Sequence, residues 1–267
     1  MQYRAESRKI VQEQLLLTTE RKALILDLLR RDRRVIAKAV SQELSLSEDT
    51  IRRDLRELAA DGLLQRVHGG ALPMSPAIVD MGERWRVAPD SKDAVASIAA
   101  TLIRPGQVVI LDGGTTTVRM ARLLPRDLRA TVVTHSPSVA VELANHPFID
   151  VELIGGRLFK HSVVTVGAGA MEAIARVRAD AFFMGVTGVH PQMGLTTGDA
   201  EEATVKRALS RQSAETFVLA SREKLGAVSP FLVLPLKEVD SLVVEPGTSV
   251  EVIELYRDAG LTVVTAD

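Results

Sequence analysis

Arginine side chains gather on the polar face of one short predicted helix near the N-terminus. The polar residues of this face follow the capping residue Ser47 and are Thr50, Arg52, Arg53 and Arg56. A guanidinium group presents a planar fork of donors that fits a guanine edge or a phosphate with two parallel hydrogen bonds. Because adjacent helix positions lie about 100° apart, we expect one of Arg52 and Arg53 to contact bases and the other to hold the DNA backbone. The spacing leaves open which does which.

This arginine-bearing helix is the third that the N-terminal segment predicts. Apolar residues recur at helical spacing over 20–30 and over 35–44, where Ile36 is expected to face inward. A short break then leads to Ser47, whose hydroxyl can cap a helix that extends to about residue 60. Gly62 is placed to end that helix. Two short helices joined by a tight turn are typical of a helix-turn-helix, whose second helix lies in the DNA major groove.

A short strand pair is predicted directly after the third helix. Residues 63–68 can form it, with Gly69 and Gly70 as its turn or exit. Such a β-wing would bring Arg66 and His68 to a phosphate or to the minor groove. The pattern alone leaves an alternative open, which is a helical bundle with a solvated arginine face.

A second group of residues suited to chemistry follows a buried strand in the C-terminal part. The loop reads Asp112-Gly113-Gly114-Thr115-Thr116-Thr117, between the apolar run 108–111 and a predicted helix over 118–124. Glycines let a backbone approach a ligand, and threonine hydroxyls with the N–H groups of the following helix can surround a phosphate. The alternative is a plain tight turn between strand and helix. No dinucleotide-binding or P-loop motif is present, so the sequence does not favour NAD or ATP, and we expect no cofactor.

The elements that position this loop alternate between strand and helix from about residue 83. The predicted strands are 108–111, 130–134, 151–154, 181–184, 216–220, 241–244 and 262–265. The predicted helices are 92–103, 118–124, 137–144, 200–210 and 250–259. Such alternation indicates an α/β fold whose parallel sheet is covered on both faces and binds ligands beyond the carboxyl ends of its strands. We interpret Asp199, Glu201 and Glu202 first as an acidic helix start, with ligand contact as the weaker alternative.

Composition narrows the classes of function further. The chain has 267 residues and no Cys, which excludes disulfides and thiolate zinc sites, and its five His lack metal-ligand spacing. Residues 1–72 hold 14 Lys and Arg against 11 Asp and Glu, whereas the remainder holds 19 against 23. If the protein binds nucleic acid, we therefore expect residues 1–72, which carry the net positive charge, to make the contact. With neither a signal peptide nor an apolar run long enough to span a bilayer, we expect a cytoplasmic protein without a membrane partner.

The proline-containing stretch 73–82 is predicted to be a linker between two domains. The expected organisation is an N-terminal extension over 1–17, a DNA-binding domain over 18–72, the linker, and a ligand-binding domain over 83–267. Apolar residues within 10–15 leave open whether the extension forms an amphipathic helix or a frayed tail.

The N-terminal motif resembles a known family. The stretch 47–55, read with Gly62-Leu63-Leu64 and with 66–71, is similar to the DNA-binding part of the DeoR family of bacterial regulators, and nearly every position of the family pattern is present. The resemblance implies a winged helix-turn-helix that binds double-stranded operator DNA. The residues implied in that contact are Ser47, Thr50, Arg52, Arg53, Arg56, Arg66 and His68.

The C-terminal motifs resemble the effector domain of the same family, which is similar in fold to ribose-5-phosphate isomerase and glucosamine-6-phosphate deaminase. The motifs that carry this resemblance are 112–116, 134–136, 155–156, 185–188 and Lys224. The resemblance implies a phosphorylated sugar or polyol as effector. Thr115, Thr116 and Thr117 would hold the phosphate, and Lys224 would approach it as a point charge. The sugar side would be lined by Asp112, His135, Ser136, Gly155 and Gly156, beside the loop glycines Gly113 and Gly114.

Several positions depart from the family pattern. His135 stands where the family often has Asn, Ser221 where it usually has Asp, and Glu245-Pro246 where it has Thr-Asp. Val186-Thr187-Gly188 occupies the place of an acidic pair in the isomerase-like enzymes. The loss of carboxylates argues against proton transfer, which needs a positioned base, so we expect no catalytic residues.

The sequence therefore predicts a transcriptional regulator, most simply a repressor of a carbohydrate operon, that works as a homodimer or homotetramer. Two alternatives stay open. One is a sugar-phosphate isomerase or deaminase fused to a DNA-binding domain. The other is a binding protein whose N-terminal helices only mediate assembly.

Overall fold

The computed structural model describes residues 17–266, and their contacts divide the chain into two units after Met74. Each unit has a hydrophobic core of its own. Of the predicted extension over 1–17 only Leu17 is described, so the question of a helix within 10–15 lies outside the described residues. No helix within 17–266 is long and apolar enough to cross a bilayer.

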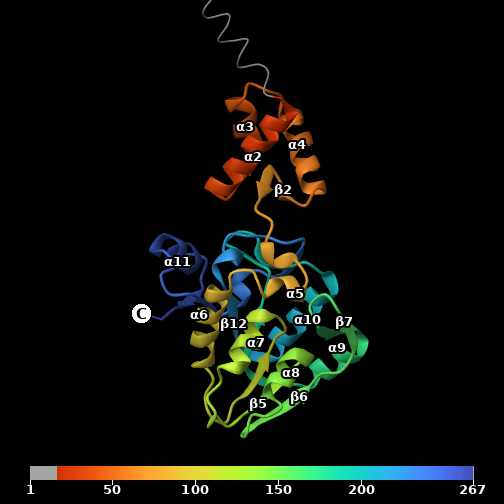
Figure 1. Cartoon of the computed structure of the whole chain (residues 1–267), viewed down its shortest axis with the longest axis vertical. Helices are drawn as coiled ribbons and strands as arrows, with labels where there is room; N and C mark the ends of the chain where they lie inside the picture. The colour runs from red at the N-terminus through yellow and green to blue at the C-terminus, as the bar shows by residue number, and fades with distance from the viewer. Residues whose placement is uncertain (1–16, 267) are drawn as a thin grey trace, which may run out of the picture. The chain divides into compact units, whose positions relative to one another are not determined.

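The first unit packs three helices against a small antiparallel sheet whose strand order is β1-β3-β2 (Figure 1). Its helices are α2 (Thr18–Asp32), α3 (Ala37–Glu43) and α4 (Glu48–Ala60). Its strands are β1 (Val35–Ile36), β2 (Gln65–Val67) and β3 (Gly70–Leu72). The core of this unit includes Ile25, Leu29, Val40, Ile51, Leu55, Leu58 and Leu64.

Helix α4 begins and ends at its predicted signals. The Ser47 hydroxyl accepts a hydrogen bond from the backbone N–H of Thr50 at 3.1 Å, which satisfies one of the free donors at the helix start. Gly62 has φ +71°, a left-handed conformation that glycine adopts without a Cβ penalty. The predicted helix-turn-helix is confirmed, with α3 and α4 as its two helices.

The start of the second helix differs from the prediction. Val35 and Ile36 form strand β1, in register with Ala71 and Gly70, and Ile36 is 49% exposed instead of facing inward. The helical phase begins only at the buried Ala37. The partner strand lies more than thirty residues further along the chain, so a pattern of local periodicity does not reveal it. A Cβ on Gly70 would lie 1.8 Å from the Val35 carbonyl oxygen, so this pairing requires a glycine.

The segment predicted as a linker over 73–82 packs on the second unit from Ser75 onward. The Ser75 N–H donates to the Val228 carbonyl, and Ser75 and Ala77 are both buried. Proline here begins a 3-10 turn (Pro76–Ile78), and helix α5 (Met81–Arg84) follows at once. Proline is well suited to a first helical position, so it marks an element start as readily as a linker.

The second unit is built on a seven-stranded parallel sheet with the order β15-β14-β12-β9-β4-β5-β6. Its strands are β4 (Val108–Leu111), β5 (Ala130–Thr134), β6 (Ile149–Leu153), β9 (Ala179–Gly185), β12 (Ser213–Ala220), β14 (Ser241–Val244) and β15 (Thr262–Val264). All seven predicted strands are present, and the α/β class is confirmed. Strand order reverses between β4 and β9, so the chain leaves these neighbouring strands in opposite directions. In open α/β sheets such a switch point opens a crevice at the carboxyl ends of the strands.

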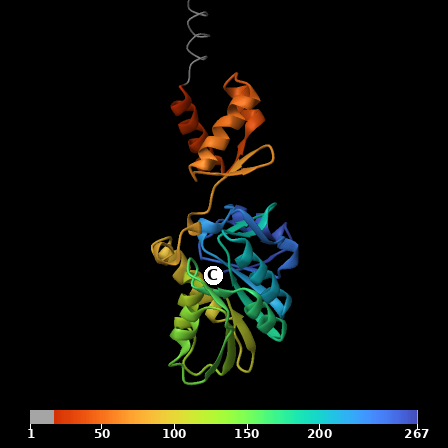
Figure 2. The ribbon, with the colours of Figure 1, turned by 90° about the vertical axis from the view of Figure 1, so that its right-hand side faces the viewer.

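Helices cover both faces of this sheet (Figure 2). The helices are α6 (Pro89–Ala100), α7 (Thr115–Arg122), α8 (Pro137–Leu143), α9 (Ala168–Ala175), α10 (Ala200–Arg211) and α11 (Val250–Arg257). Side chains that alternate along each strand enter two separate cores, so Phe182 belongs to one and Phe183 to the other. Two predicted helices begin earlier than expected: α6 starts at Pro89 and α7 at Thr115.

Short antiparallel strands that the sequence did not predict extend this unit. They are β7 (Arg157–Phe159) with β8 (Val164–Val166), and β10 (Gly188–His190) with β11 (Gly194–Thr197) and β13 (Phe231–Leu234). Two 3-10 turns, Arg222–Lys224 and Leu236–Glu238, follow β12 and β13.

Candidate functional site

A cradle of polar residues lies at the switch point of the large sheet. Its lining comes from the ends of three neighbouring strands, with Gly113 after β4, Thr187 after β9 and Lys224 after β12. Because α7 starts at Thr115, the three threonines form the first turn of a helix and are not part of a loop. Gly113 has no room for a side chain, since a Cβ there would lie 2.1 Å from Val164 Cγ1.

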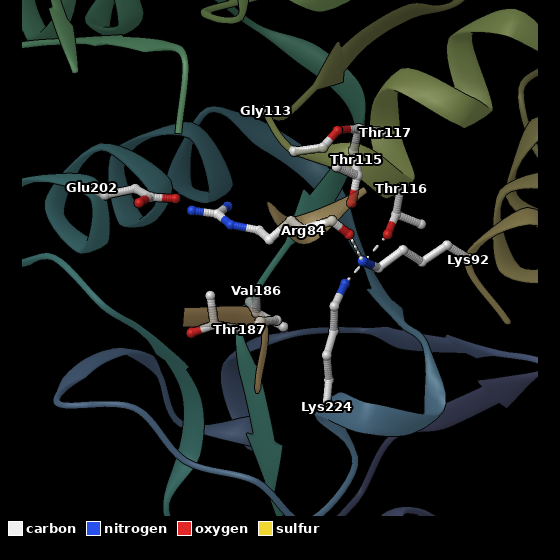
Figure 3. A pocket seen from close by; sticks show the side chains of 13 residues that line it. Arg84, Lys92, Gly113, Thr115, Thr116, Thr117, Val186, Thr187, Glu202 and Lys224 are labelled. Carbon is white, nitrogen blue, oxygen red and sulfur yellow. Dashed lines mark hydrogen bonds between the residues drawn. The ribbon is translucent and has the colours of Figure 1, made fainter. Parts of the chain in front are cut away.

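Two lysine side chains, Lys92 and Lys224, converge on this threonine turn (Figure 3), whereas the Arg84 guanidinium points away from it toward Glu202. Lys224 Nζ donates to Thr116 Oγ1 at 3.4 Å and to the Leu219 carbonyl at 3.2 Å. Lys92 Nζ donates to the Arg84 carbonyl at 2.7 Å. Figure 3 shows the two ammonium groups side by side next to the Thr116 hydroxyl. All three cations are buried, with at most 8% of any of them exposed.

The electrostatics of the cradle favour an anion. Burial, together with the neighbouring Lys224 ammonium, lowers the pKa of Lys92 to about 8. Burial likewise lowers the pKa of Lys224 and that of Arg84. A lowered lysine pKa means that the protein penalises the charged form, and a bound anion would remove that penalty. The cradle therefore combines hydroxyl donors with buried positive charge, which is the chemistry of phosphate binding.

One carboxylate limits the positive charge on the other side of the cradle. Glu202, in the first turn of α10, lies at 3.2 Å from Lys206 Nζ, and its Oε2 accepts from Ser162 Oγ at 3.0 Å. The same Ser162 hydroxyl accepts from Arg84 Nη2 at 2.9 Å. Asp199 caps α10 by accepting from the N–H groups of Glu201 and Glu202, so the interpretation of this acidic stretch as a helix start is correct. Glu202 nevertheless also lines the cradle.

Asp112 and His135, expected on the sugar side, instead form a buried network. Asp112 is fully buried, and its carboxylate accepts from Lys206 at 2.5 Å and from the backbone N–H of Gly185 at 2.8 Å. His135 lies at 2.8 Å from Asp112 Oδ1 and at 3.1 Å from the Thr165 carbonyl. Although burial opposes ionisation, Lys206 and His135 hold the pKa of Asp112 at about 2. These side chains line neither cavity of this region because their polar atoms are used inside the fold.

Ser136, Gly155 and Gly156 also lie away from the cradle lining. Ser136 caps α8, because its hydroxyl accepts from the Val139 N–H. Gly155 and Gly156 are exposed between β6 and β7. Gly156 allows the close approach of β8, since a Cβ there would lie 2.8 Å from the Val166 carbonyl oxygen. Of the predicted ligand residues, the structure brings together Gly113, Gly114, Thr115, Thr116, Thr117 and Lys224.

Residues outside the predicted set complete the cradle. Arg84 and Lys92 come from helices α5 and α6, before the first strand of the sheet, and Ala77 comes from the segment predicted to be a linker. No motif marks these positions in the sequence. A charged residue on an otherwise inward helix face, as Lys92 is on α6, was the available signal.

A second cavity of about 310 Å³ adjoins the cradle, whose own free volume is only about 20 Å³. The two share Arg84, Thr187 and Glu202. The remaining lining of the second cavity is Ile78, Phe159, His161, Thr197, Gly198 and Asp199.

In the first unit, the predicted DNA-contacting residues lie on α4 and on the β2–β3 hairpin. A groove of about 240 Å³ between these elements is lined by Arg52, Arg66 and His68. Arg52 is paired with Glu48 on the helix surface at 2.7 Å. Arg53 and Arg56 are exposed, and neither has an ion-pair partner within 17–266. Ser47 and Thr50 hydrogen-bond each other at 2.8 Å and form the helix start.

A buried ion pair fixes the arginine-bearing helix to its neighbour. The Arg21 guanidinium on α2 pairs with Asp54 on α4, and Asp54 is 1% exposed. Two guanidinium nitrogens of Arg21 donate to the two carboxylate oxygens of Asp54. Such a bidentate contact fixes the orientation of the two helices more closely than a single hydrogen bond would.

Comparison with known proteins assigns both units. Residues 21–76 match the DeoR-like helix-turn-helix domain, and residues 87–246 match the DeoR C terminal sensor domain. The chain is 34% identical over 251 residues to the HTH-type transcriptional regulator GlpR of Haloferax volcanii, covering 93% of this chain and 98% of the relative. It is 31% identical over 228 residues to the HTH-type transcriptional repressor GlcR of Bacillus subtilis, covering 85% and 88%.

The glycerol-3-phosphate regulon repressor of Escherichia coli is 27% identical over 241 residues, with 90% of this chain and 96% of the relative covered. Among solved structures, ribose 5-phosphate isomerase A from Methanocaldococcus jannaschii is similar at a TM-score of 0.39 and 19% identity. That match covers 51% of this chain, and the chain spans about half the length (54%) of the isomerase.

Proposed function

The chain belongs to the DeoR family of helix-turn-helix transcriptional regulators, and we propose that a phosphorylated sugar or polyol in its cradle changes its affinity for operator DNA. The observation that carries this proposal is that Lys92 and Lys224 converge on the threonine turn, in a cavity whose wall Arg84 also lines. The nearby carboxylates of Glu202 and Glu223 do not balance the three buried cations, so the arrangement stays unfavourable until an anion joins them. A phosphate monoester supplies two negative charges and several acceptors at once.

The first unit binds DNA in this proposal through α4 and the hairpin. The exposed arginines Arg53 and Arg56 have no protein partner within 17–266 and are available for phosphates or base edges. Arg66 and His68 on the hairpin share a groove with Arg52. A helix-turn-helix protein that reads two symmetric half-sites does so as an oligomer of matching symmetry, so we propose a homodimer or homotetramer on a palindromic operator.

The route from ligand to DNA starts in the segment that directly follows the first unit. Residues 75–84 supply Ala77 and Arg84 to the cradle wall and Ile78 to the second cavity. His161 and Ser162 hold this segment, through the Ile78 carbonyl at 3.0 Å and Arg84 Nη2 at 2.9 Å. A free volume of about 20 Å³ is far below that of a phosphate, so binding must move side chains of the cradle. Any shift of Arg84 then reaches the chain that leads to the DNA-binding unit.

We propose repression of a carbohydrate operon, relieved or strengthened by the effector, and action in the cytoplasm, where the regulated DNA lies. The relatives named above as repressors support this direction of regulation.

The test combines two measurements on the full chain. A thermal-shift screen of phosphorylated sugars and polyols should raise the melting temperature for at least one compound, because a ligand of the native state stabilises it by mass action. Fluorescence anisotropy with DNA from upstream of the protein's own gene should show specific binding whose affinity that compound changes. A shift in DNA affinity of about 5–150-fold is typical of such coupling. Specific DNA binding that no phosphorylated compound alters would contradict the proposal.

A second candidate function is a sugar-phosphate isomerase, favoured by the carboxylate of Glu202 in the cradle wall. Its two oxygens are, however, engaged by Lys206 and Ser162, which opposes a role as a free base. The protein can be incubated with ribose, fructose and glucosamine phosphates, and their conversion at an enzyme-like rate would favour this candidate. We propose that the protein is a regulator without catalytic activity.

A further inference from the structure

The second cavity continues the cradle and has a different chemical character. The two cavities share the walls formed by Arg84, Thr187 and Glu202, so one molecule can occupy both. The cradle contributes Lys92 and Lys224, whereas the second cavity contributes Asp199. Charge therefore changes along the combined site, from net positive at the threonine turn to net negative beyond Glu202.

Asp199 has an acceptor available for a ligand. Its Oδ1 caps α10 by accepting from the N–H groups of Glu201 at 3.0 Å and Glu202 at 2.9 Å. Its Oδ2 has no hydrogen-bond partner among the described residues, and the side chain is half-buried in the cavity wall. A carboxylate oxygen in this position accepts from a hydroxyl group and repels a second phosphate.

Thr197 provides an independent observation in the same wall. The residue is 1% exposed, and its hydroxyl has no hydrogen-bond partner within 17–266. Buried hydroxyl groups in native proteins are nearly always paired, so an unpaired one beside a cavity indicates a partner that joins later. A hydroxyl of a ligand can act as that partner, because it both donates and accepts.

Part of the lining of the second cavity is apolar. Phe159 and Ile78 line it, and the Phe159 ring lies 5.7 Å from the His161 ring, measured between centroids. Such a surface packs against the C–H faces of a sugar, while the Asp199 carboxylate in the same lining accepts from its hydroxyls. A volume of about 310 Å³ is also much larger than the body of a three-carbon polyol needs.

From this arrangement we infer that the second cavity holds the hydroxyl-bearing body of a hexose monophosphate whose phosphate lies in the cradle. This inference rests on the proposed function. It adds that three-carbon phosphates leave the cavity mostly unfilled, and that sugar bisphosphates place a second anion against Asp199 and Glu202. The site selects one phosphate and a neutral six-carbon body.

Calorimetric titration of the full chain with four probes tests the size and charge selection. The probes are inorganic phosphate, glycerol 3-phosphate, fructose 1-phosphate and fructose 1,6-bisphosphate. We expect fructose 1-phosphate to bind at least about tenfold more tightly than glycerol 3-phosphate, because it adds several paired hydroxyls. We expect the bisphosphate to bind more weakly than the monophosphate. Equal affinity for the three-carbon and six-carbon monophosphates, or tighter binding of the bisphosphate, would overturn the inference.

Three variants assign the effect to the second cavity. Thr197→Val removes the hydroxyl and keeps the shape, so fructose 1-phosphate should bind about fivefold to tenfold more weakly while inorganic phosphate binds unchanged. Thr197→Ser restores a hydroxyl and should recover most of the affinity. Asp199→Asn keeps a good helix cap and removes the charge, so it should reduce the difference in affinity between fructose 1,6-bisphosphate and fructose 1-phosphate. A Thr197→Val variant that weakens inorganic phosphate equally would contradict the assignment.

The two proposals fail in different ways. If neither phosphate nor any sugar phosphate binds, the cradle itself is not a phosphate site and the proposed function fails. If inorganic phosphate binds and Lys224→Met abolishes that binding, but the hexose body adds no affinity, only the inference about the second cavity fails.

Discussion

Arg84 and Glu202 are joined through a single buried hydroxyl, since Ser162 Oγ accepts from the Arg84 guanidinium at 2.9 Å and donates to the Glu202 carboxylate at 3.0 Å. Arg84 belongs to the segment that follows the DNA-binding unit, whereas Glu202 starts helix α10 on the sheet. The Ser162 bridge therefore connects the cavity wall formed by Glu202 to the segment that follows the first unit.

Ser162→Ala should reduce the coupling between effector and DNA more than it reduces either binding step. The variant keeps both charged groups and removes only the hydroxyl that relates their positions. We expect the ratio of operator affinities with and without saturating effector to fall toward one, from the usual range of about 5–150. Anisotropy titrations measure the ratio, and Ser210→Ala, which removes a hydroxyl bonded to Thr216 on another part of the fold, is the control. An unchanged ratio would show that the bridge carries no coupling.

Lys224→Met should abolish phosphate binding and stabilise the free protein. The substitution removes a buried cation whose pKa burial lowers, so it relieves the desolvation penalty of the charged form in the free protein. Thermal unfolding with and without inorganic phosphate measures both effects. Lys160→Met, at an exposed lysine, is the matched control and should change neither. A variant that still gains melting temperature from phosphate would refute the role of Lys224.

Lys92 should make stability and phosphate affinity depend on pH in opposite directions. Its folded pKa is about 8, whereas an unfolded lysine titrates near about 10.4. Between these values the unfolded state binds more protons, so the Lys92 contribution makes unfolding harder as pH rises, by at most about 1.4 kcal/mol per pH unit. Phosphate affinity should fall over the same window because the ammonium loses its charge.

The Lys92 effect is isolated by comparison with Lys92→Met, since other groups titrate in the same range. The difference in unfolding free energy between the two proteins, measured by denaturant titration from pH 7 to 10.5, should change with the sign given above. A difference that is flat with pH would mean that Lys92 is not destabilised in its charged form.

Arg53→Ala should weaken operator binding while leaving the fold and the effector affinity intact. Arg53 is exposed on α4 and has no ion-pair partner within 17–266, so its loss costs the folded unit little. A guanidinium that reads a base contributes about 1–3 kcal/mol, and its removal relaxes specificity at one position. If it holds the backbone instead, all sequences should weaken alike and the salt dependence should decrease. Arg30→Ala on α2 is the control, and equal losses in the two variants would count against α4 as the recognition helix.

Asp54→Ala should destabilise the first unit selectively. The change leaves the Arg21 guanidinium without its buried carboxylate, and breaking a buried ion pair in this way typically costs about 3–5 kcal/mol. Two-transition calorimetry should show the melt of the first unit shifted downward and that of the second unit unchanged. Phosphate binding should survive, which separates this effect from general misfolding.

Strong local signals allowed much of this fold to be predicted from the sequence. Helix α4 was predicted with its start and its end because both are set within a few residues, by the Ser47 hydroxyl and by Gly62. The buried strand 241–244 has the predicted bounds because its apolar run is uninterrupted. Strand β1 was missed because its two residues depend on a partner far along the chain.

The lining of the cradle was predicted in part for the same reason. The threonine turn and Lys224 were found because they belong to contiguous motifs, whereas Arg84 and Lys92 reach the cradle only through tertiary folding. Asp112 and His135 belong to the same motifs, yet burial and Lys206 draw them into a network inside the fold. Sequence proximity to the threonine turn therefore did not distinguish a residue that lines the cradle from a residue buried inside the fold.

The small free volume of the cradle also limits how fast a ligand can bind. A cavity with a free volume of about 20 Å³ has room for about one water molecule, so a phosphate group enters only when cradle side chains such as Lys92 or Lys224 move aside. Association then waits for these opening fluctuations, so the observed on-rate should level off at high metabolite concentration instead of rising without limit. In the proposed regulator, a rise in metabolite concentration that is shorter than the time between openings leaves DNA binding unchanged.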